Sequence, residues 1–136
     1  MLEKIFGKNI GKKKGKKVLI VEDDSLLAKV LAESFLKEKF QVAVVDNGLE
    51  AEKTAKSFSP DIILLDLIIP GIDGFAVLKQ LKAGTKTKNI PVAVLSNLGD
   101  VGDIKSTKAL GADEYFIKAN TEMEKIVKYV KNKLKV

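Results

Sequence analysis

The hydrophobic pattern of this chain alternates between short continuous apolar runs and longer segments in which apolar residues recur every three or four positions. The runs are too short for helices of normal length, and they are rich in β-branched residues. They are therefore expected to form strands buried on both faces, as in a parallel sheet that is covered by helices. The predicted strands span residues 18–21, 41–45, 62–65, 91–95 and 114–117.

The segments between these runs predict five helices, whose ends are indicated by capping and turn residues. Asp24 is a candidate N-cap for a helix that begins near Ser25. The second helix precedes Ser59-Pro60, and the third spans about 75–81. Gly111 is a candidate C-cap for a helix over about 101–110, and Thr121 with Glu124 forms a capping-box signature before the last helix. The residues expected to point inward are Leu27, Val30, Leu31, Ser34 and Phe35, then Ala51, Ala55 and Phe58, and finally Met123, Ile126, Val127, Val130 and Leu134.

Five strands that alternate with five helices through short loops predict an α/β fold, with a parallel sheet and helices on both of its faces. Right-handed crossovers leave few topologies, and a flavodoxin-like doubly wound (βα)5 fold with strand order 2-1-3-4-5 is favoured. This order places the first and third strands side by side at the switch point. No glycine-rich phosphate loop follows the first strand, so nucleotide binding is not indicated.

The charge of the chain is unevenly distributed. Its 136 residues fit one domain, and its net charge of +6 arises within the first 17 residues, which hold seven of the 24 lysines and one glutamate. We expect residues 1–16 to form a basic, disordered tail and residues 17–136 to form the domain. Two interpretations of the tail remain open, weak attraction to an anionic membrane or nucleic acid, and a solvated leader.

Missing residue types narrow the chemistry further. The chain contains no cysteine and no histidine, which removes thiolate and imidazole metal ligands and histidine general-base catalysis. Every basic residue is a lysine, so bidentate recognition of phosphate or guanine by arginine is excluded. No apolar run reaches membrane-spanning length and no secretory signal is present, so a cytoplasmic location is expected.

The carboxyl ends of four predicted strands carry polar side chains, at the edge where open α/β sheets bind ligands. They are Glu22 and Asp23 after the first strand, Asp66 after the third, Ser96 after the fourth and Lys118 after the fifth. An alternative interpretation of Asp66 is that it caps a turn, and the polar groups at the other strand ends count against it. Because parallel strands end at one edge of the sheet, we expect all five side chains to lie near one another.

Three neighbouring carboxylates repel one another unless a cation joins them. Oxygen ligands without cysteine or histidine favour Mg²⁺ over Zn²⁺, with Mn²⁺ as an alternative. Ser96 and Lys118 cannot bind the cation in their usual forms, but both donate hydrogen bonds to anionic oxygens. Acids with a cation on one side and donors on the other predict a phosphoryl site, in which Asp66 is the candidate nucleophile.

From about Lys17 to Leu134 the chain resembles a response-regulator receiver domain of the single-domain type. The matching motifs are Val-Leu-Ile-Val-Glu22-Asp23-Asp24, Asp66-Leu-Ile-Ile-Pro70-Gly-Ile-Asp73-Gly74, Val-Leu-Ser96 and Gly111-Ala-Asp113-Glu-Tyr115-Phe-Ile-Lys118. The resemblance implies a phosphoprotein of a two-component phosphorelay, in which a sensor histidine kinase or phosphotransfer protein passes a phosphoryl group to Asp66 with Mg²⁺.

Residue roles also follow from the resemblance. It implies that Asp23 and Asp66 ligate the metal directly, that Ile68 contributes its backbone carbonyl, and that Glu22 acts through water. It implies that Ser96 and Lys118 bind phosphoryl oxygens. Movement of Ser96 coupled to rotation of Tyr115 is the switch that relatives use, and it reshapes the face of the fourth helix, fifth strand and fifth helix.

The chain departs from the family pattern at positions around the pocket. Ala119 follows Lys118 where relatives usually carry proline, often after a cis bond, and the sequence leaves open whether this bond is cis or trans. Asn97 replaces a small residue and is expected to narrow access to the pocket. Ile68 and Leu98 occupy positions that orient hydrolytic water in relatives, and because both are apolar we expect slow self-dephosphorylation.

The expected output is protein contact rather than DNA binding, because arginine is absent and the charge of residues 18–136 is balanced. The lysines of the last helix fit either a solvated face or docking to an acidic partner. Asp113 matches a position used by dimerising relatives, although the arginines that they use are missing, which leaves a phosphorylation-dependent homodimer open. The expected function is a phosphorylation-dependent switch without independent enzyme activity. Two alternatives are an unphosphorylated scaffold and an aspartyl-phosphate phosphohydrolase, and Ile68 counts against the phosphohydrolase.

Overall fold

The computed structural model describes residues 4–6 and 15–136, which are built around a six-stranded sheet with strand order β1-β3-β2-β4-β5-β6. The strands are β1 (Lys4–Phe6), β2 (Lys17–Val21), β3 (Gln41–Val45), β4 (Ile62–Leu65), β5 (Val92–Ser96) and β6 (Glu114–Ile117). β1 pairs with β3 in antiparallel fashion, and the remaining pairs are parallel. The five parallel strands have the predicted order 2-1-3-4-5, so the predicted flavodoxin-like fold is confirmed.

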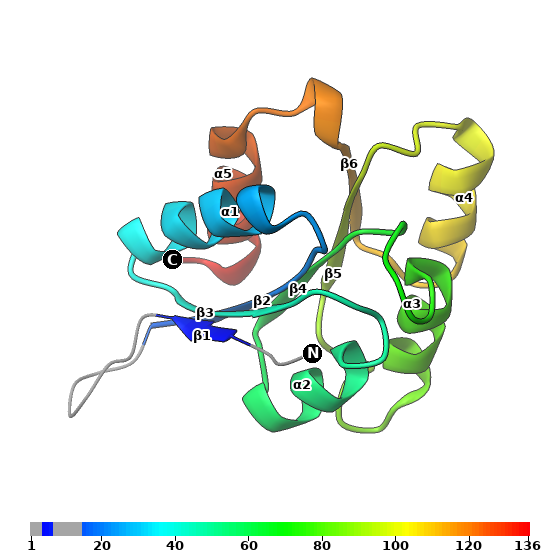
Figure 1. The fold of residues 1–136 in the computed structure, drawn as a ribbon, viewed down its shortest axis with the longest axis horizontal. Coiled ribbons are helices and arrows are strands. Elements are labelled where there is room, and N and C mark those ends of the chain that lie inside the picture. The colour runs from blue at the N-terminus through cyan, green and yellow to red at the C-terminus, as the bar shows by residue number, and fades with distance from the viewer. Residues whose placement is uncertain (1–3, 7–14) are drawn as a thin grey trace.

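Helices cover both faces of the sheet. They are α1 (Ser25–Lys37), α2 (Ala51–Phe58), α3 (Gly74–Ala83), α4 (Val101–Ala109) and α5 (Met123–Leu134), with a 3₁₀ turn η1 (Lys118–Asn120) before α5. Figure 1 shows α1 and α5 on one side of the sheet and α2, α3 and α4 on the other. All four residues of β4 are buried, because Ile62 and Leu64 face the α1–α5 layer while Ile63 and Leu65 face the opposite layer. This two-sided burial explains why the strands lack the alternation of half-exposed sheets.

The predicted N-cap at Asp24 is confirmed, whereas the predicted capping box before α5 is not formed. The Asp24 side chain accepts hydrogen bonds from the backbone N–H groups of Leu26 and Leu27 at the start of α1. Asp73, whose capping was not predicted, accepts a hydrogen bond from the backbone N–H of Ala76 at the start of α3. The capping box predicted at Thr121 is wrong, since the Thr121 hydroxyl donates to the Ile117 carbonyl at 2.9 Å and α5 has no side-chain cap bond.

The inward face of α1 also differs from the prediction. The buried residues of this helix are Ala28, Leu31, Ala32 and Phe35. Val30 was expected to point inward but is 41% exposed. The helix face that packs against the sheet consists of Ala28, Leu31, Ala32 and Phe35, and Val30 lies outside it. The two small alanine side chains do not stand out in a hydrophobic pattern, although they let the helix approach the sheet closely.

The expectation for residues 1–16 is tested only in part, since residues 1–3 and 7–14 lie outside the described residues. Lys4–Phe6 were expected to belong to a disordered tail, and they instead form β1, in register with Val42, Ala43 and Val44 of β3. Without β1, the outer backbone groups of β3 would form an unpaired sheet edge, which readily accepts another strand. The boundary between tail and domain stays a prediction.

Membrane insertion was not expected from the sequence. Across the helices of the described ranges, none combines the length and the apolar character that crossing a bilayer requires.

Gly74 lies where the start of α3 passes close to the backbone that follows β4. Its N–H donates to the Leu67 carbonyl at 2.9 Å, which holds the start of α3 against the segment that follows β4. A Cβ at this position would overlap the Asp66 carbonyl oxygen and the Leu67 Cα atom. The absence of a side chain at Gly74 therefore fixes the path of the chain around Asp66.

We predict that Gly74→Ala lowers the free energy of unfolding by about 2 kcal/mol, because the new methyl group forces rigid backbone apart. Urea unfolding followed by circular dichroism measures this change. Gly102→Ala is the matched control, since a Cβ there meets only the Asp100 carboxylate at 3.9 Å. It is expected to leave stability unchanged or slightly raised, and equal losses in the two variants would contradict the prediction.

Candidate functional site

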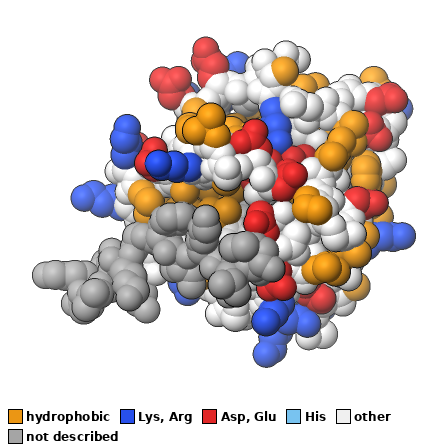
Figure 2. All heavy atoms as spheres, in the orientation of Figure 1, with side chains coloured by type: hydrophobic (Ala, Val, Ile, Leu, Met, Phe, Trp, Pro, Cys, Tyr) orange, Lys and Arg blue, Asp and Glu red, His pale blue; other side chains and the backbone are white. Residues whose placement is uncertain are grey.

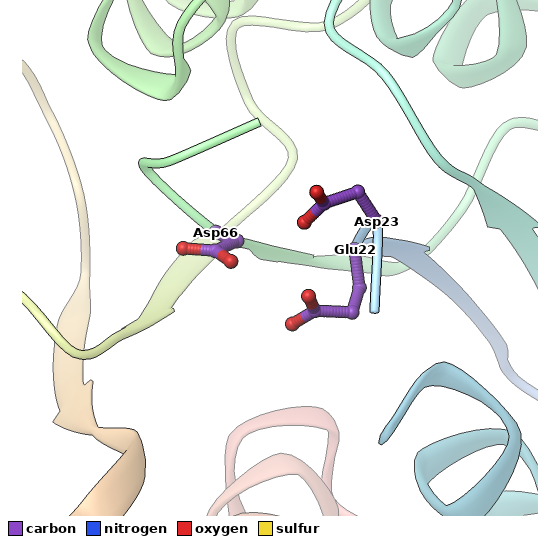
Figure 3. A group of neighbouring side chains, drawn as sticks. All are labelled: Glu22, Asp23 and Asp66. Carbon is purple, nitrogen blue, oxygen red and sulfur yellow. The ribbon is translucent and has the colours of Figure 1, made fainter. Parts of the chain in front are cut away.

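Three carboxylates meet at the carboxyl end of the sheet because β2 and β4 are neighbouring parallel strands. Val21 pairs in register with Leu65, so the next residues, Glu22 and Asp66, leave the two strands side by side. Asp23 follows directly. One carboxylate oxygen from each of Glu22, Asp23 and Asp66 lies within 4.8 Å of the other two, and Figure 3 shows the three side chains together at the ends of their strands.

Two of these carboxylates are removed from solvent. Glu22 is 3% exposed and Asp66 is 5% exposed, whereas Asp23 is exposed. Burying an ionised carboxylate is costly unless hydrogen bonds or opposite charges compensate. Backbone donors compensate in part, since Glu22 accepts from the Asp24 N–H at 3.0 Å and Asp66 Oδ1 accepts from the Ile68 N–H at 3.1 Å. In the orientation of Figure 1, acidic side chains gather near the middle of the surface (Figure 2).

Lys118 joins the two buried carboxylates. Its Nζ atom lies 2.7 Å from Glu22 Oε1 and 2.7 Å from Asp66 Oδ2, and its side chain is 16% exposed. Burial alone lowers the pKa of Lys118, but the hydrogen bonds to Asp66 and Glu22 outweigh burial, so the pKa of Lys118 is raised above its ordinary 10.5. The ammonium is therefore held in its charged form.

Glu22 responds differently to the same contact. Burial is the largest influence and raises the pKa of Glu22 above its ordinary 4.5, although the hydrogen bond from Lys118 acts in the opposite direction. The ammonium of Lys118 thus does not fully offset the desolvation of Glu22. With all three acids ionised, the cluster carries two more negative charges than positive ones, which equals the charge of one divalent cation.

The side-chain atoms of this cluster that could ligate a metal are all oxygen atoms. The cluster supplies carboxylates from Glu22, Asp23 and Asp66, and its geometry fits a metal ion. Hard cations such as Mg²⁺ and Mn²⁺ take this kind of donor, and the lack of nitrogen and sulfur ligands disfavours Zn²⁺. The acidic cluster is therefore a candidate metal site.

Ser96 and Tyr115 meet at the backbone of Leu98. Ser96 ends β5 and is fully buried, and its Oγ accepts a hydrogen bond from the Leu98 N–H at 3.4 Å. The Tyr115 hydroxyl donates to the Leu98 carbonyl. Burial, followed by the charges of Asp103 and Asp66, raises the pKa of Tyr115. The two side chains that were predicted to move together are thus connected here through one peptide segment.

The chain after Lys118 contains a contact that the sequence did not predict. No cis peptide bond occurs in the described residues, so the Lys118–Ala119 bond is trans, and the Lys118 ammonium nevertheless reaches both acids. The Asn97 Oδ1 atom accepts a hydrogen bond from the Ala119 N–H at 3.1 Å. The presence of alanine instead of proline was the available signal, because proline has no N–H to donate.

Comparisons with known proteins agree with this geometry. A family model described as the response regulator receiver domain matches residues 18–131. Sporulation initiation phosphotransferase F from Bacillus subtilis is 38% identical over 102 residues, which cover 75% of this chain and 81% of that protein. The chain spans less than half of the transcriptional regulators it also matches, 42% and 44% of two of them.

Solved structures give the same result. A putative response regulator from Chloroflexus aurantiacus J-10-fl has a TM-score of 0.81 and 30% identity, over 88% of this chain and 97% of that one. The phosphorylated cyanobacterial phytochrome response regulator RcpA has a TM-score of 0.72 and 30% identity, over 86% of this chain and 89% of that one.

We predict that Lys118→Met lowers the free energy of unfolding by about 3 kcal/mol at neutral pH without divalent cations, because it leaves two buried carboxylates without their ammonium. The loss should shrink as the pH falls, since protonation of Glu22, whose pKa is raised, removes the unpaired charge. It should also shrink as the pH rises through the pKa of Lys118, where the ammonium of the wild type is lost. Urea unfolding of the wild type and Lys118→Met, from acidic pH to above the pKa of Lys118, measures how the stability loss shrinks in both directions.

Lys131→Met is the matched control. Lys131 pairs with Glu38 at 2.6 Å, but both side chains are more than a third exposed, so its removal should cost less than about 1 kcal/mol. A loss in Lys118→Met that is as small as in the control, or that does not change with pH, would disprove the buried pairing.

Proposed function

The chain belongs to the response-regulator receiver domain family of two-component systems, and we propose that it is a phosphorylation-dependent switch that accepts a phosphoryl group on Asp66. The observation that carries the proposal is the group of three carboxylates at adjacent strand ends with one ammonium shared between Glu22 and Asp66. This arrangement combines a buried nucleophile, a shortage of positive charge and a donor that is already beside the nucleophile.

In the proposed reaction, a carboxylate oxygen of Asp66 attacks the phosphorus of a phosphohistidine on a sensor kinase or a phosphotransfer protein. The new O–P bond forms while the P–N bond breaks, and the bonding electrons leave with the imidazole nitrogen. Lys118 is the first donor for the incoming phosphoryl oxygens, because its Nζ lies 2.7 Å from Asp66 Oδ2. The Ser96 hydroxyl is the second donor.

The proposed metal is Mg²⁺, with Mn²⁺ as an alternative. Asp23 and Asp66 would ligate it directly, together with the Ile68 backbone carbonyl, and Glu22 would act through water. When bound, the ion offsets negative charge on the carboxylates and on the phosphoryl group. The excess negative charge of the cluster supports this assignment.

The proposed switch uses the Leu98 backbone. If Ser96 turns its hydroxyl toward a phosphoryl group, it releases the Leu98 N–H that it now holds. The Leu98 carbonyl, to which the Tyr115 hydroxyl donates, belongs to the same residue, so the two events are coupled. We propose that the change is read by a downstream protein at the face of α4, β6 and α5, and that the domain is a switch without independent enzyme activity.

A homodimer is less well supported than a monomeric switch. Asp113, the position that dimerising relatives use, is engaged within its own chain. Its carboxylate accepts from the Val92 N–H at 2.9 Å and lies 3.8 Å from Lys133. A dimer through Asp113 would have to replace these contacts.

We predict that wild-type protein incubated with acetyl phosphate and Mg²⁺ gains the mass of one phosphoryl group, and that Asp66→Asn does not, because the amide is a poor nucleophile. Intact-mass spectrometry measures the product. Asp46→Asn is the matched control, since Asp46 follows β3, the strand next to β2, outside the acidic cluster. A folded wild type that stays unmodified would favour the scaffold alternative, and catalytic turnover of a phosphate ester would favour the phosphohydrolase alternative.

We also predict that the phosphorylated protein hydrolyses slowly and that Ile68→Asn hydrolyses several-fold faster. Ile68 lies two residues after the phosphoacceptor and is 59% exposed, so its apolar side chain offers no hydrogen bond to an attacking water, whereas asparagine does. Acid quenching followed by mass spectrometry gives the decay rate. Val136→Asn replaces an exposed apolar residue elsewhere and should decay like the wild type. Faster decay in the wild type than in Ile68→Asn would refute the prediction.

A further inference from the structure

The ends of β5 and β6 carry two of the proposed phosphoryl donors on adjacent strands. Ser96 and Ile117 are partners in the parallel register, so the chain after each strand begins at the same level of the sheet. The two segments then lie close together, since a Cβ on Gly99 would lie 3.2 Å from the Ile117 Cδ1 atom. A contact between these segments can therefore fix the position of one donor relative to the other.

The turn that carries Lys118 is not anchored by core packing. It is the 3₁₀ turn η1, in which no residue is buried, and Ala119 and Asn120 are exposed. Polar contacts hold it instead. The Thr121 hydroxyl donates to the Ile117 carbonyl at 2.9 Å, and the Ala119 N–H donates to Asn97 Oδ1 at 3.1 Å. The first of these bonds is local to the turn, whereas the second connects it to the segment after β5.

The Lys118 side chain reaches two acids from this turn. Its four methylene groups are flexible, so the position of its ammonium depends on where the backbone of η1 is held. Asn97 directly follows Ser96 and Ala119 directly follows Lys118, so this contact joins the two residues that are next in sequence to the proposed donors. Pre-positioned donors are more effective than donors that must be ordered during the reaction.

We infer that Asn97 is a positioning residue, whose carboxamide oxygen holds the Ala119 N–H and thereby fixes the Lys118 ammonium at the distance from Ser96 that a phosphoryl group requires. The inference rests on the proposed function, because it assigns Asn97 a role in binding the phosphoryl group. It also assigns a purpose to the alanine after Lys118, which supplies the N–H. Asn97 acts through the backbone of η1 and does not itself bind the phosphoryl group.

The first measurement is hydrogen exchange of the Ala119 amide in unmodified protein, followed by NMR. Asn97→Ala should accelerate this exchange, because the amide is exposed and loses its acceptor. Asn97→Asp should restore protection, since a carboxylate oxygen can accept the same bond. Asn120→Ala, which removes the neighbouring exposed carboxamide, is the matched control and should leave the Ala119 amide protected.

The second measurement is the affinity for beryllofluoride with Mg²⁺, a probe with the shape and charge of a phosphoryl group. Asn97→Ala should weaken binding about three-fold to ten-fold, the range that corresponds to losing one hydrogen bond of ordinary net strength. Ala119→Pro removes the donor and should weaken binding similarly. The double variant should bind no more weakly than either single variant, because both changes break the same contact.

The outcomes separate the inference from the proposed function. A folded wild type that binds no beryllofluoride overturns the proposed function and, with it, the role of Asn97. If the wild type binds and Asn97→Ala binds equally well, the role of Asn97 alone is overturned, whether or not the Ala119 amide exchanges faster. Additive losses in the double variant also overturn it. Urea unfolding of each variant keeps changes in global stability apart from changes in affinity.

Discussion

The site depends on one electrostatic imbalance, because two buried carboxylates share a single ammonium. Lys118 lies 2.7 Å from both Glu22 and Asp66, and Asp23 adds a third acid at the surface of the same group. The ammonium lets the chain fold with these acids in the interior, yet it does not cancel their charge. A receiver domain needs both properties. If positive side chains cancelled all of the acidic charge, the site would not attract a cation, and if the acids had no positive partner, burying them would be too costly.

The parallel sheet produces this imbalance through its topology. Glu22 and Asp66 become neighbours because β2 and β4 pair in register and end at the same level. The apolar residues of these strands are buried on both faces, so the strands cannot slide without exposing core side chains. Gly74 then lets α3 approach the backbone of Asp66 more closely than any larger residue would allow. The register of the strands and the packing of the backbone around Asp66 therefore determine how close the acids are.

Much of this was accessible from the sequence, for a physical reason. The strand order, the five helices and the meeting of acids at one sheet edge follow from periodicity and from the right-handed crossover rule, which average over many residues. The features that were missed depend on single contacts. Thr121 bonds to Ile117 instead of capping α5, and Asn97 accepts from Ala119. The Thr121 hydroxyl chooses between two local partners, which the sequence does not rank. The Asn97 bond joins two segments that are distant in the sequence, so only the folded arrangement brings them together.

The strand β1 changes which part of the sheet is open to other chains. Because residues 4–6 occupy the outer side of β3, an incoming strand would have to pair with this three-residue segment or displace it. An edge strand of three residues offers few backbone groups for pairing with another chain. Short edge strands are one way in which proteins prevent sheets from pairing between molecules. Removal of residues 4–6 would leave the outer backbone groups of β3 unpaired along its full length. A protein truncated in this way would therefore aggregate through this edge more readily than the protein that carries β1.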